Sequence, residues 1–135
     1  MADDINYTVN RQISAKQFIE LLRATTLGER RPLDDNSCIQ GMLDNANLCI
    51  TAWQNDTLVG IARSVTDFHY ACYLSDLAVH QDFQKLGIGK KLLAVTLEQL
   101  KPPCKLILIS APAANDYYKH IGFTHNPRCW VIEKA

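Results

Sequence analysis

Residues 84–90 read QKLGIGK, with two closely spaced glycines at the head of an apolar helical pattern. The first amide groups of a helix lack partners within the helix and carry the positive end of its dipole. Glycine has no β-carbon, so a ligand can approach its backbone closely. A strand, a short loop and such a helix start favour an anion, with phosphate or pyrophosphate as the natural guest. Close packing of the helix on a sheet is the alternative explanation for the glycines.

Two common phosphate-binding motifs do not fit this stretch. The chain has no GxxxxGK[ST] sequence, so a P-loop is excluded. A Rossmann fingerprint needs the motif G-x-G-x-x-G directly after the first strand. Here the position of the third glycine is occupied by Leu92.

Two longer segments of the sequence are more specific than the glycines alone. Residues 76–93, DLAVHQDFQKLGIGKKLL, place a strand, a short loop and Q-x-x-G-x-G in succession, and residues 113–123 read AANDYYKHIGF. Together they resemble the acyl-CoA-binding motif and the A-x-x-[FY]-Y-x-x-x-G-F segment of the GNAT superfamily of N-acetyltransferases. The resemblance covers nearly the whole chain. One departure is Ala111, where many members have Asn; the nearby Asn115 is the candidate for that cofactor contact.

The resemblance implies that acetyl-CoA is the co-substrate and that no metal takes part. Its pyrophosphate is expected on the backbone amides of residues 86–90, and its pantetheine arm along the fourth strand. An amide near Val79 would face the thioester oxygen and stabilise the charge that grows there. The implied cofactor-binding residues are Leu77, Ala78, Val79, Gln84, Lys85, Leu86, Gly87, Ile88, Gly89, Lys90 and Asn115.

Tyr118 occupies the position at which the family places its general-acid tyrosine. A phenol is a reasonable proton donor to the departing thiolate when the geometry is right. The alternative is that Tyr118 forms an aromatic edge of the core with Tyr117 and Phe123. Tyr117 is interpreted as a packing residue.

No motif fixes the group that accepts the proton of the amine. Asp76 is the catalytic candidate, because it lies on the fourth strand beside the expected oxyanion donor. Strand alternation also allows it to point away and pair elsewhere. Ser75 and Tyr73 holding a relay water, or a carboxylate of the loop at residues 26–36, remain alternatives.

Other reactive side chains are given structural roles. His80 is expected at a loop start, and the adjacency of Asp67 and His69 indicates a surface turn. The five cysteines include no CxxC pair, so neither a metal site nor a disulfide framework is predicted. Direct transfer needs no acyl-cysteine, so Cys72 and Cys104 are interpreted as packing residues.

The element pattern predicts one α/β (α+β) domain over residues 1–135, with a mixed, mostly antiparallel twisted sheet flanked by helices. Ser14 is a predicted helix N-cap, and Gly122 a predicted helix end. After a first strand, the expected elements are helices at 14–25 and 37–46, a hairpin at 48–65 turning at 54–56, a strand at 70–79, a helix at 87–101, a strand at 105–110, a helix at 111–121 and a strand at 128–135.

Composition narrows the class of partner. The apolar fraction is 47%, and 14 Lys and Arg balance 14 Asp and Glu, so no net charge attracts a nucleic acid. No apolar run reaches the length of a membrane span, and the N-terminus lacks a secretory pattern. A cytoplasmic protein with reduced thiols, no nucleic-acid partner and no membrane partner is expected.

The predicted function is transfer of acetyl from acetyl-CoA directly to a primary amine, in a ternary complex. The acceptor is a small molecule or an amino-terminal group. A homodimer is expected by analogy with compact family members. The alternative function is a non-catalytic acyl-CoA-binding sensor or regulatory module. A toxin-type enzyme acting on charged transfer RNA is disfavoured by the charge balance.

Overall fold

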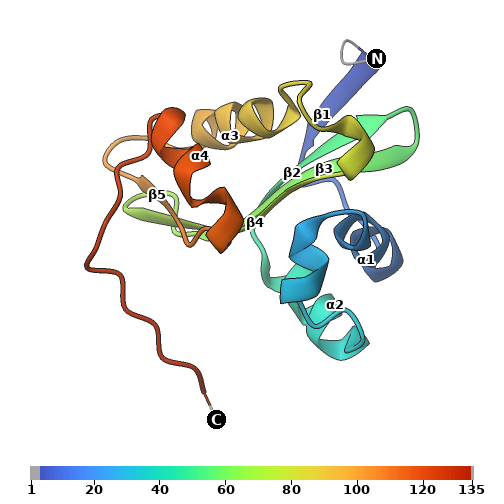
Figure 1. The fold of residues 1–135 in the computed structure, drawn as a ribbon, viewed down its shortest axis with the longest axis horizontal. Helices are drawn as coiled ribbons and strands as arrows, with labels where there is room; N and C mark the ends of the chain where they lie inside the picture. The colour runs from blue at the N-terminus through green and yellow to red at the C-terminus, as the bar shows by residue number, and fades with distance from the viewer. Residues whose placement is uncertain (1–3, 135) are drawn as a thin grey trace.

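The computed structural model describes residues 4–134, and its centre is one five-stranded sheet (Figure 1). The strand order is β1-β2-β3-β4-β5. The first four strands are antiparallel, and β5 joins β4 in parallel. This confirms the predicted mixed, mostly antiparallel sheet. The strands are β1 (Ile5–Val9), β2 (Leu48–Gln54), β3 (Thr57–Thr66), β4 (Ala71–Val79) and β5 (Lys105–Leu108).

Residues 4–134 also contain seven helical segments, of which the last two follow the last strand. The first segment begins where the sequence predicts. Ser14 accepts a hydrogen bond from the amide of Gln17 at 3.1 Å, and its own amide donates to the Gln17 side chain at 2.9 Å. This reciprocal cap satisfies two amides that the helix leaves free. The segments are α1 (Ala15–Arg23), η2 (Thr26–Arg30), α2 (Asn36–Asn45), η3 (Gln81–Phe83), α3 (Ile88–Glu98), η4 (Pro112–Ala114) and α4 (Asn115–His120).

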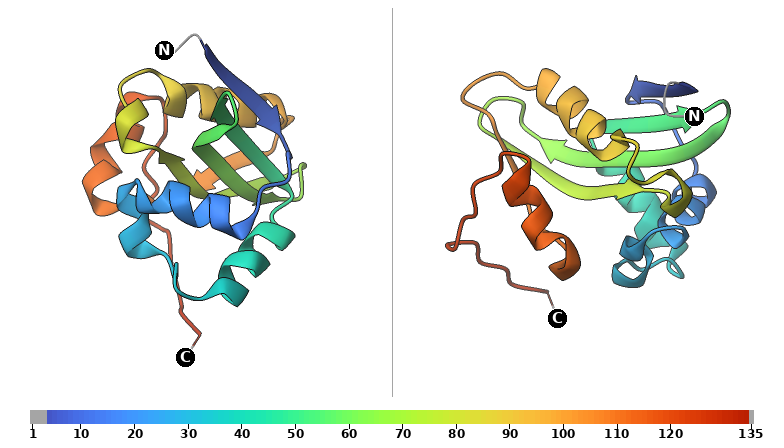
Figure 2. Two further views of the ribbon diagram at one scale, coloured as in Figure 1. Left: turned by 90° about the vertical axis from the view of Figure 1, so that its right-hand side faces the viewer. Right: turned by 45° about the horizontal axis from the view of Figure 1, so that its top comes forward.

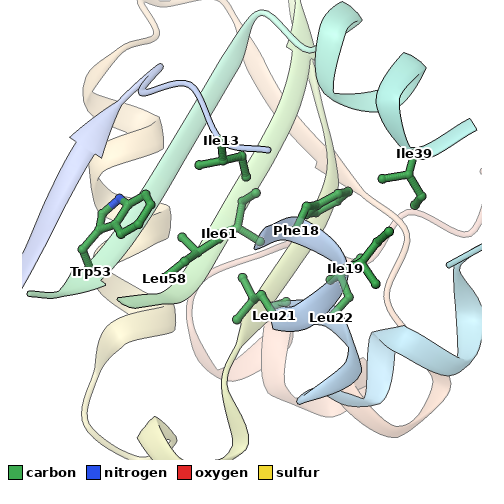
Figure 3. Close-up of a cluster of buried hydrophobic side chains, with 10 residues drawn as sticks. Ile13, Phe18, Ile19, Leu21, Leu22, Ile39, Trp53, Leu58 and Ile61 are labelled. Carbon is green, nitrogen blue, oxygen red and sulfur yellow. The ribbon is translucent and has the colours of Figure 1, made fainter. Parts of the chain in front are cut away.

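The helices cover both faces of the sheet, with α1 and α2 on one face and α3 on the other (Figure 2). Each face has its own apolar core. Phe18 and Leu22 of α1 pack with Ile61 beneath the first face (Figure 3). Ile88 and Leu92 of α3 pack in the cluster on the opposite face. The sheet is therefore packed between two apolar cores, and this packing positions β4.

A bulge in β4 changes which face its side chains meet. Arg63 pairs with Asp76 while Ser64 pairs with Leu74, so Ser75 is the extra residue. Before the bulge Leu74 faces the α3 core; after it Ala78 faces the α1 core. Pairing with β5 also ends at Leu74. The last part of β4 is therefore open along the edge that β5 leaves.

The predicted C-terminal strand is wrong for residues 128–134, which form no regular structure (Figure 1), and residue 135 lies outside the described residues. Trp130 and Ile132 are 90% and 96% exposed. A strand is stabilised by the hydrogen bonds and side-chain contacts of a neighbour, and this segment has none in the described chain. Its composition favours a strand, but one chain supplies no partner for it.

Candidate active site

The start of α3 has the backbone form expected of an anion site. Gly87 is the N-cap, with φ +80°, a conformation that favours glycine. Lys85, two residues earlier, also has a positive φ of 64°. Among residues 4–134, no backbone acceptor receives a hydrogen bond from the amides of residues 86–90.

The alternative that the two glycines serve close packing is not supported by their surroundings. A β-carbon on Gly87 would meet nothing within 4 Å. On Gly89 it would come no closer than 3.5 Å to the Tyr117 hydroxyl and 3.8 Å to Val79, which are ordinary contacts. Neighbouring atoms therefore do not require glycine at either position. The positive φ of Gly87 explains glycine at that position. Both glycines leave space in front of the start of α3.

The open edge of β4 exposes backbone groups near this helix start. The His80 amide donates to the Val59 carbonyl of β3 at 2.8 Å. Backbone groups alternate between edges along an antiparallel strand, so those of Val79 and Leu77 point away from β3. The Gln84 side chain agrees with this direction, because it donates to the Val79 carbonyl at 3.3 Å. Ala78, by contrast, turns its backbone groups to β3.

A cavity of about 80 Å³ lies where β4 and β5 separate. Its walls come from β4, from β5 and the turn that follows it, from α4 and from the segment after α1. Most lining side chains are apolar, and polar groups come from Thr26, Arg31, Ser75 and Tyr118. The lining residues are Thr26, Leu27, Arg31, Leu74, Ser75, Leu77, Leu108, Ile109, Ala111, Ala114 and Tyr118.

Tyr118 both packs and faces this cavity. Its ring makes edge contacts with Tyr117 and Phe123, at centroid distances of 5.4 and 5.5 Å. Burial raises the pKa of Tyr118 above its ordinary value of 10, so the phenol keeps its proton at neutral pH. The aromatic packing therefore positions a protonated hydroxyl at the cavity instead of excluding a chemical role.

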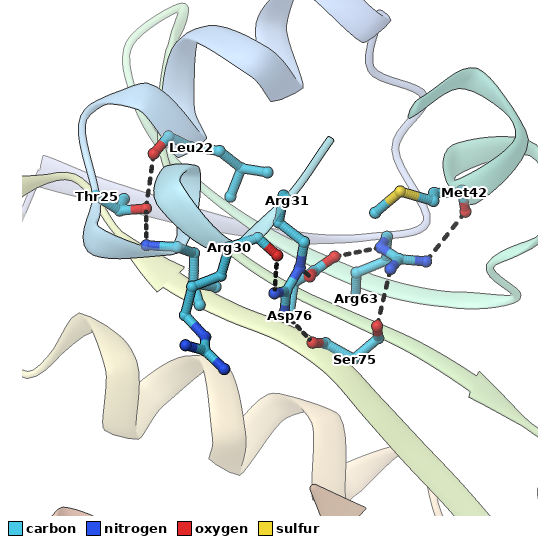
Figure 4. A network of polar contacts seen from close by, with 9 residues as sticks. Leu22, Thr25, Arg30, Arg31, Met42, Arg63, Ser75 and Asp76 are labelled. Atoms are coloured by element: carbon cyan, nitrogen blue, oxygen red, sulfur yellow. Dashed lines mark hydrogen bonds and ion pairs between the residues drawn. The ribbon is translucent and has the colours of Figure 1, made fainter. Parts of the chain in front are cut away.

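Asp76 is paired with two arginines, whereas a general base needs a free oxygen to accept a proton. Its side chain is fully buried, and both oxygens accept hydrogen bonds: from Arg31 Nε at 2.6 Å and from Arg63 Nε at 2.5 Å (Figure 4). Both carboxylate oxygens are therefore engaged in charge-assisted hydrogen bonds to guanidinium groups. The geometry therefore argues against Asp76 as the acceptor of the amine proton and favours a positioning role.

The sequence analysis missed Arg31, which lines the cavity, and Arg63, which holds Asp76 together with Arg31. Arg63 interrupts the apolar run of β3, and a charge in a strand buried on both faces needs a partner. That signal pointed toward a buried carboxylate. No local signal connected Arg31, which follows η2, to β4.

The remaining candidates keep structural contacts. His80 Nδ1 accepts from the Asp82 amide at 3.1 Å and caps η3. Asp67 accepts from three backbone amides, which lower its pKa to about 2, and contacts the backbone of His69 instead of its ring. Asn115 begins α4, where its side-chain oxygen accepts from Ser110 at 3.1 Å.

The cysteines give a test of these surroundings. All five are free; Cys38 and Cys129 are exposed, and burial raises the pKa of Cys49 to about 11. Because the thiolate is the nucleophile, we expect iodoacetamide at pH 8 to label Cys38 and Cys129 first, with Cys49 reacting only as pH rises toward 11. Peptide mass spectrometry reports the order. Early labelling of Cys49 in folded protein would contradict its burial.

Comparison with known proteins gives the class. A sequence profile of the acetyltransferase (GNAT) domain matches residues 30–128. The ycf52 protein of Pyropia yezoensis, named an uncharacterized N-acetyltransferase, is 29% identical over 130 residues, covering 92% of this chain and 72% of the relative. The ycf52-like protein of Prochlorococcus marinus is 30% identical over 125 residues, covering 87% and 68%.

Solved structures share the fold. A GNAT family acetyltransferase of Streptococcus pneumoniae superposes with a TM-score of 0.76 at 20% identity, covering 96% of this chain and 99% of that one. AAC(6')-Iy, solved in complex with a CoA-containing bisubstrate analogue, superposes with a TM-score of 0.71 at 15% identity, covering 97% of this chain and 98% of that one. The chain belongs to the GNAT family of N-acetyltransferases. Within that family it is ycf52-like.

Two further observations concern the described part of the chain. No helix within residues 4–134 combines the length and apolar character needed to cross a membrane. In the same residues, no three His, Cys, Asp or Glu side chains gather in a way that would hold a metal ion.

Proposed function

We propose that this N-acetyltransferase moves the acetyl group of acetyl-CoA directly to a primary amine while both are bound. The observation that carries the proposal is the continuity of three features: free amides at the α3 start, the open edge of β4, and a cavity containing Tyr118. An extended ligand with a phosphate end and an amide-bearing arm matches that order.

The pyrophosphate would be bound by the amides of residues 86–90, with Gln84 and Lys85 beside it. The pantetheine amides would pair with the open edge of β4 at Leu77 and Val79. Ala78 would contribute packing only, since its backbone faces β3. Asn115 begins α4, next to the cavity residue Ala114, and would contact the cofactor from there.

In the transfer, the neutral amine nitrogen attacks the thioester carbonyl, the C–S bond breaks, and the nitrogen loses a proton. The Val79 amide would stabilise the charge that develops on the carbonyl oxygen. Tyr118 would donate its proton to the departing sulfur, which leaves as a free thiol, and the resulting phenolate would regain a proton from solvent. With Asp76 engaged by two arginines, solvent water is the proposed acceptor of the amine proton.

We also propose that the protein is a homodimer. The outer edge of β5 has no strand partner in the described chain, and the exposed Trp130, Val131 and Ile132 have none either. Unpaired strand edges and exposed apolar segments favour association. Light scattering should then give a mass of two chains for wild type. The double variant Trp130→Ser, Ile132→Ser should give the mass of one chain. A monomeric wild type at micromolar concentration would exclude the dimer.

A cytoplasmic or similarly reducing location is supported by the five unpaired thiols. A relative from Arabidopsis thaliana, 31% identical over 71 residues, is named chloroplastic, which is a statement about that protein.

Calorimetric titration with acetyl-CoA tests the binding site. Wild type should bind with one site per chain. Gly89→Glu should weaken binding at least about 10-fold, because it adds bulk and negative charge where the pyrophosphate is proposed.

Gly41→Glu is the matched control. It makes the same change in α2, where a β-carbon meets nothing within 4 Å. Equal affinity of both variants and wild type would remove the α3 start from the proposed site.

A further inference from the structure

The buried network at Asp76 has an unbalanced charge. Arg31 and Arg63 share one carboxylate, so two cations face one anion and the group carries a net charge of +1. The side chains of Asp76 and Arg63 are 0% and 6% exposed, and that of Arg31 is 20% exposed. A charge so poorly solvated is stabilised by a nearby counter-charge.

The protein does not supply a second carboxylate in residues 4–134. No acidic group other than Asp76 lies within 4.0 Å of either guanidinium. The carboxylate nearest to Arg31 in sequence, Glu29, is exposed on η2 and forms no ion pair among the described residues. Asp35 caps α2 by accepting from the Cys38 amide at 3.0 Å. A ligand that carries an anionic group would supply the missing counter-charge.

Arg31 is the member of the network that a ligand can reach. It lines the cavity with Tyr118, whereas Arg63 does not. Its position is fixed by three bonds: to Asp76, to the Arg30 carbonyl at 3.0 Å and to the Ser75 carbonyl at 2.9 Å (Figure 4). A guanidinium has five N–H groups, so two of those on Arg31 have no partner among the described residues.

We propose that the acceptor is an amine that also carries a carboxylate, which Arg31 binds at the cavity. Guanidinium groups that are already oriented bind carboxylates with short, charge-assisted bonds. The apolar lining around Arg31 suits an aliphatic body between these groups. This inference rests on the proposed function, because the same cavity presents the amine to the thioester.

The same charge helps the chemistry and sets specificity. A net positive group beside the amine disfavours its ammonium form, which offsets the loss of Asp76 as a base. It also disfavours acceptors with several positive charges. The structure of an aminoglycoside acetyltransferase from a soil metagenome shares this fold, and polycationic acceptors are expected to be poor here.

The test is a matched series of leucine, leucinamide and isopentylamine, with kcat/KM measured for each by thiol release. Leucine should exceed the other two by about 10- to 100-fold, the range for a hydrogen bond to a charged group. In Arg31→Gln the ratio of leucine to leucinamide should fall to near one. Arg30→Gln removes the same charge from the adjacent residue and should keep the wild-type ratio.

A binding measurement on the wild-type protein distinguishes failure of this inference from failure of the transferase function. Because it uses no variant, it does not depend on whether Arg31→Gln folds. Binding of N-acetyl-leucine and N-acetyl-leucinamide to wild type is measured with CoA present. Tighter binding of the carboxylate form without turnover would support a carboxylate site at Arg31 and overturn the transferase function. Equal kcat/KM values for leucinamide and leucine in wild type would overturn this inference and leave the transferase function standing. No preference in either readout, with no turnover, would overturn both.

Discussion

Tyr118→Phe is expected to lower kcat by about 100-fold while KM for acetyl-CoA changes little. General acids contribute roughly 10²–10⁴-fold, and Phe keeps the ring that contacts Tyr117 and Phe123. The loss should therefore be confined to proton delivery to the sulfur. Steady-state kinetics with saturating amine measures it, and a thermal melt confirms that the fold is intact.

Tyr117→Phe provides the control for this experiment. It removes a hydroxyl from the neighbouring ring, 3.5 Å from the β-carbon position of Gly89. Its effect on kcat should be small, because its hydroxyl is not part of the cavity lining. Equal losses in both variants would show that the aromatic edge, and not the Tyr118 proton, matters for catalysis.

The largest stability loss is expected for Asp76→Asn, at about 3–5 kcal/mol. Removing one partner of a buried ion pair leaves the other charge unsatisfied, and here two arginines lose their shared anion. Urea denaturation measures the free energy of unfolding. Asp34→Asn, a neutralisation at an exposed carboxylate of the loop before α2, should change it little.

The same variant distinguishes positioning from base catalysis. If Asp76 positions Arg31, Asp76→Asn should raise KM for the acceptor and remove the preference for leucine over leucinamide. A variant of wild-type stability that loses only kcat, with an altered acidic limb in its pH profile, would restore Asp76 as the base.

Local signals in the sequence predicted local structure well. Ser14 with Gln17 predicts the start of α1, and the residues around Asn55 predict the hairpin, where Asn55 has a φ of 54°. Gly122 ends α4 with a φ of 100°, and the Phe123 amide closes back on the Tyr118 carbonyl at 3.0 Å. Each depends on residues only a few positions apart.

The parts that sequence did not predict depend on distant partners. The role of Asp76 is decided by Arg31 and Arg63, which are 45 and 13 residues away. The bulge at Ser75 arises from the register of β4 on β3. The segment at 128–134 has strand-forming composition but no neighbour in the described chain. Such contacts are set by tertiary packing, which periodicity and capping signals do not encode.

The most direct test of the central claim is amine-dependent release of free thiol from acetyl-CoA, with the acetylated amine identified by mass spectrometry. We expect one thiol for each acetylated amine, no release without an amine, and strong loss of both in Tyr118→Phe. Binding of acetyl-CoA without thiol release on any primary amine, carboxylated or not, would contradict the account and leave an acyl-CoA-binding module in its place.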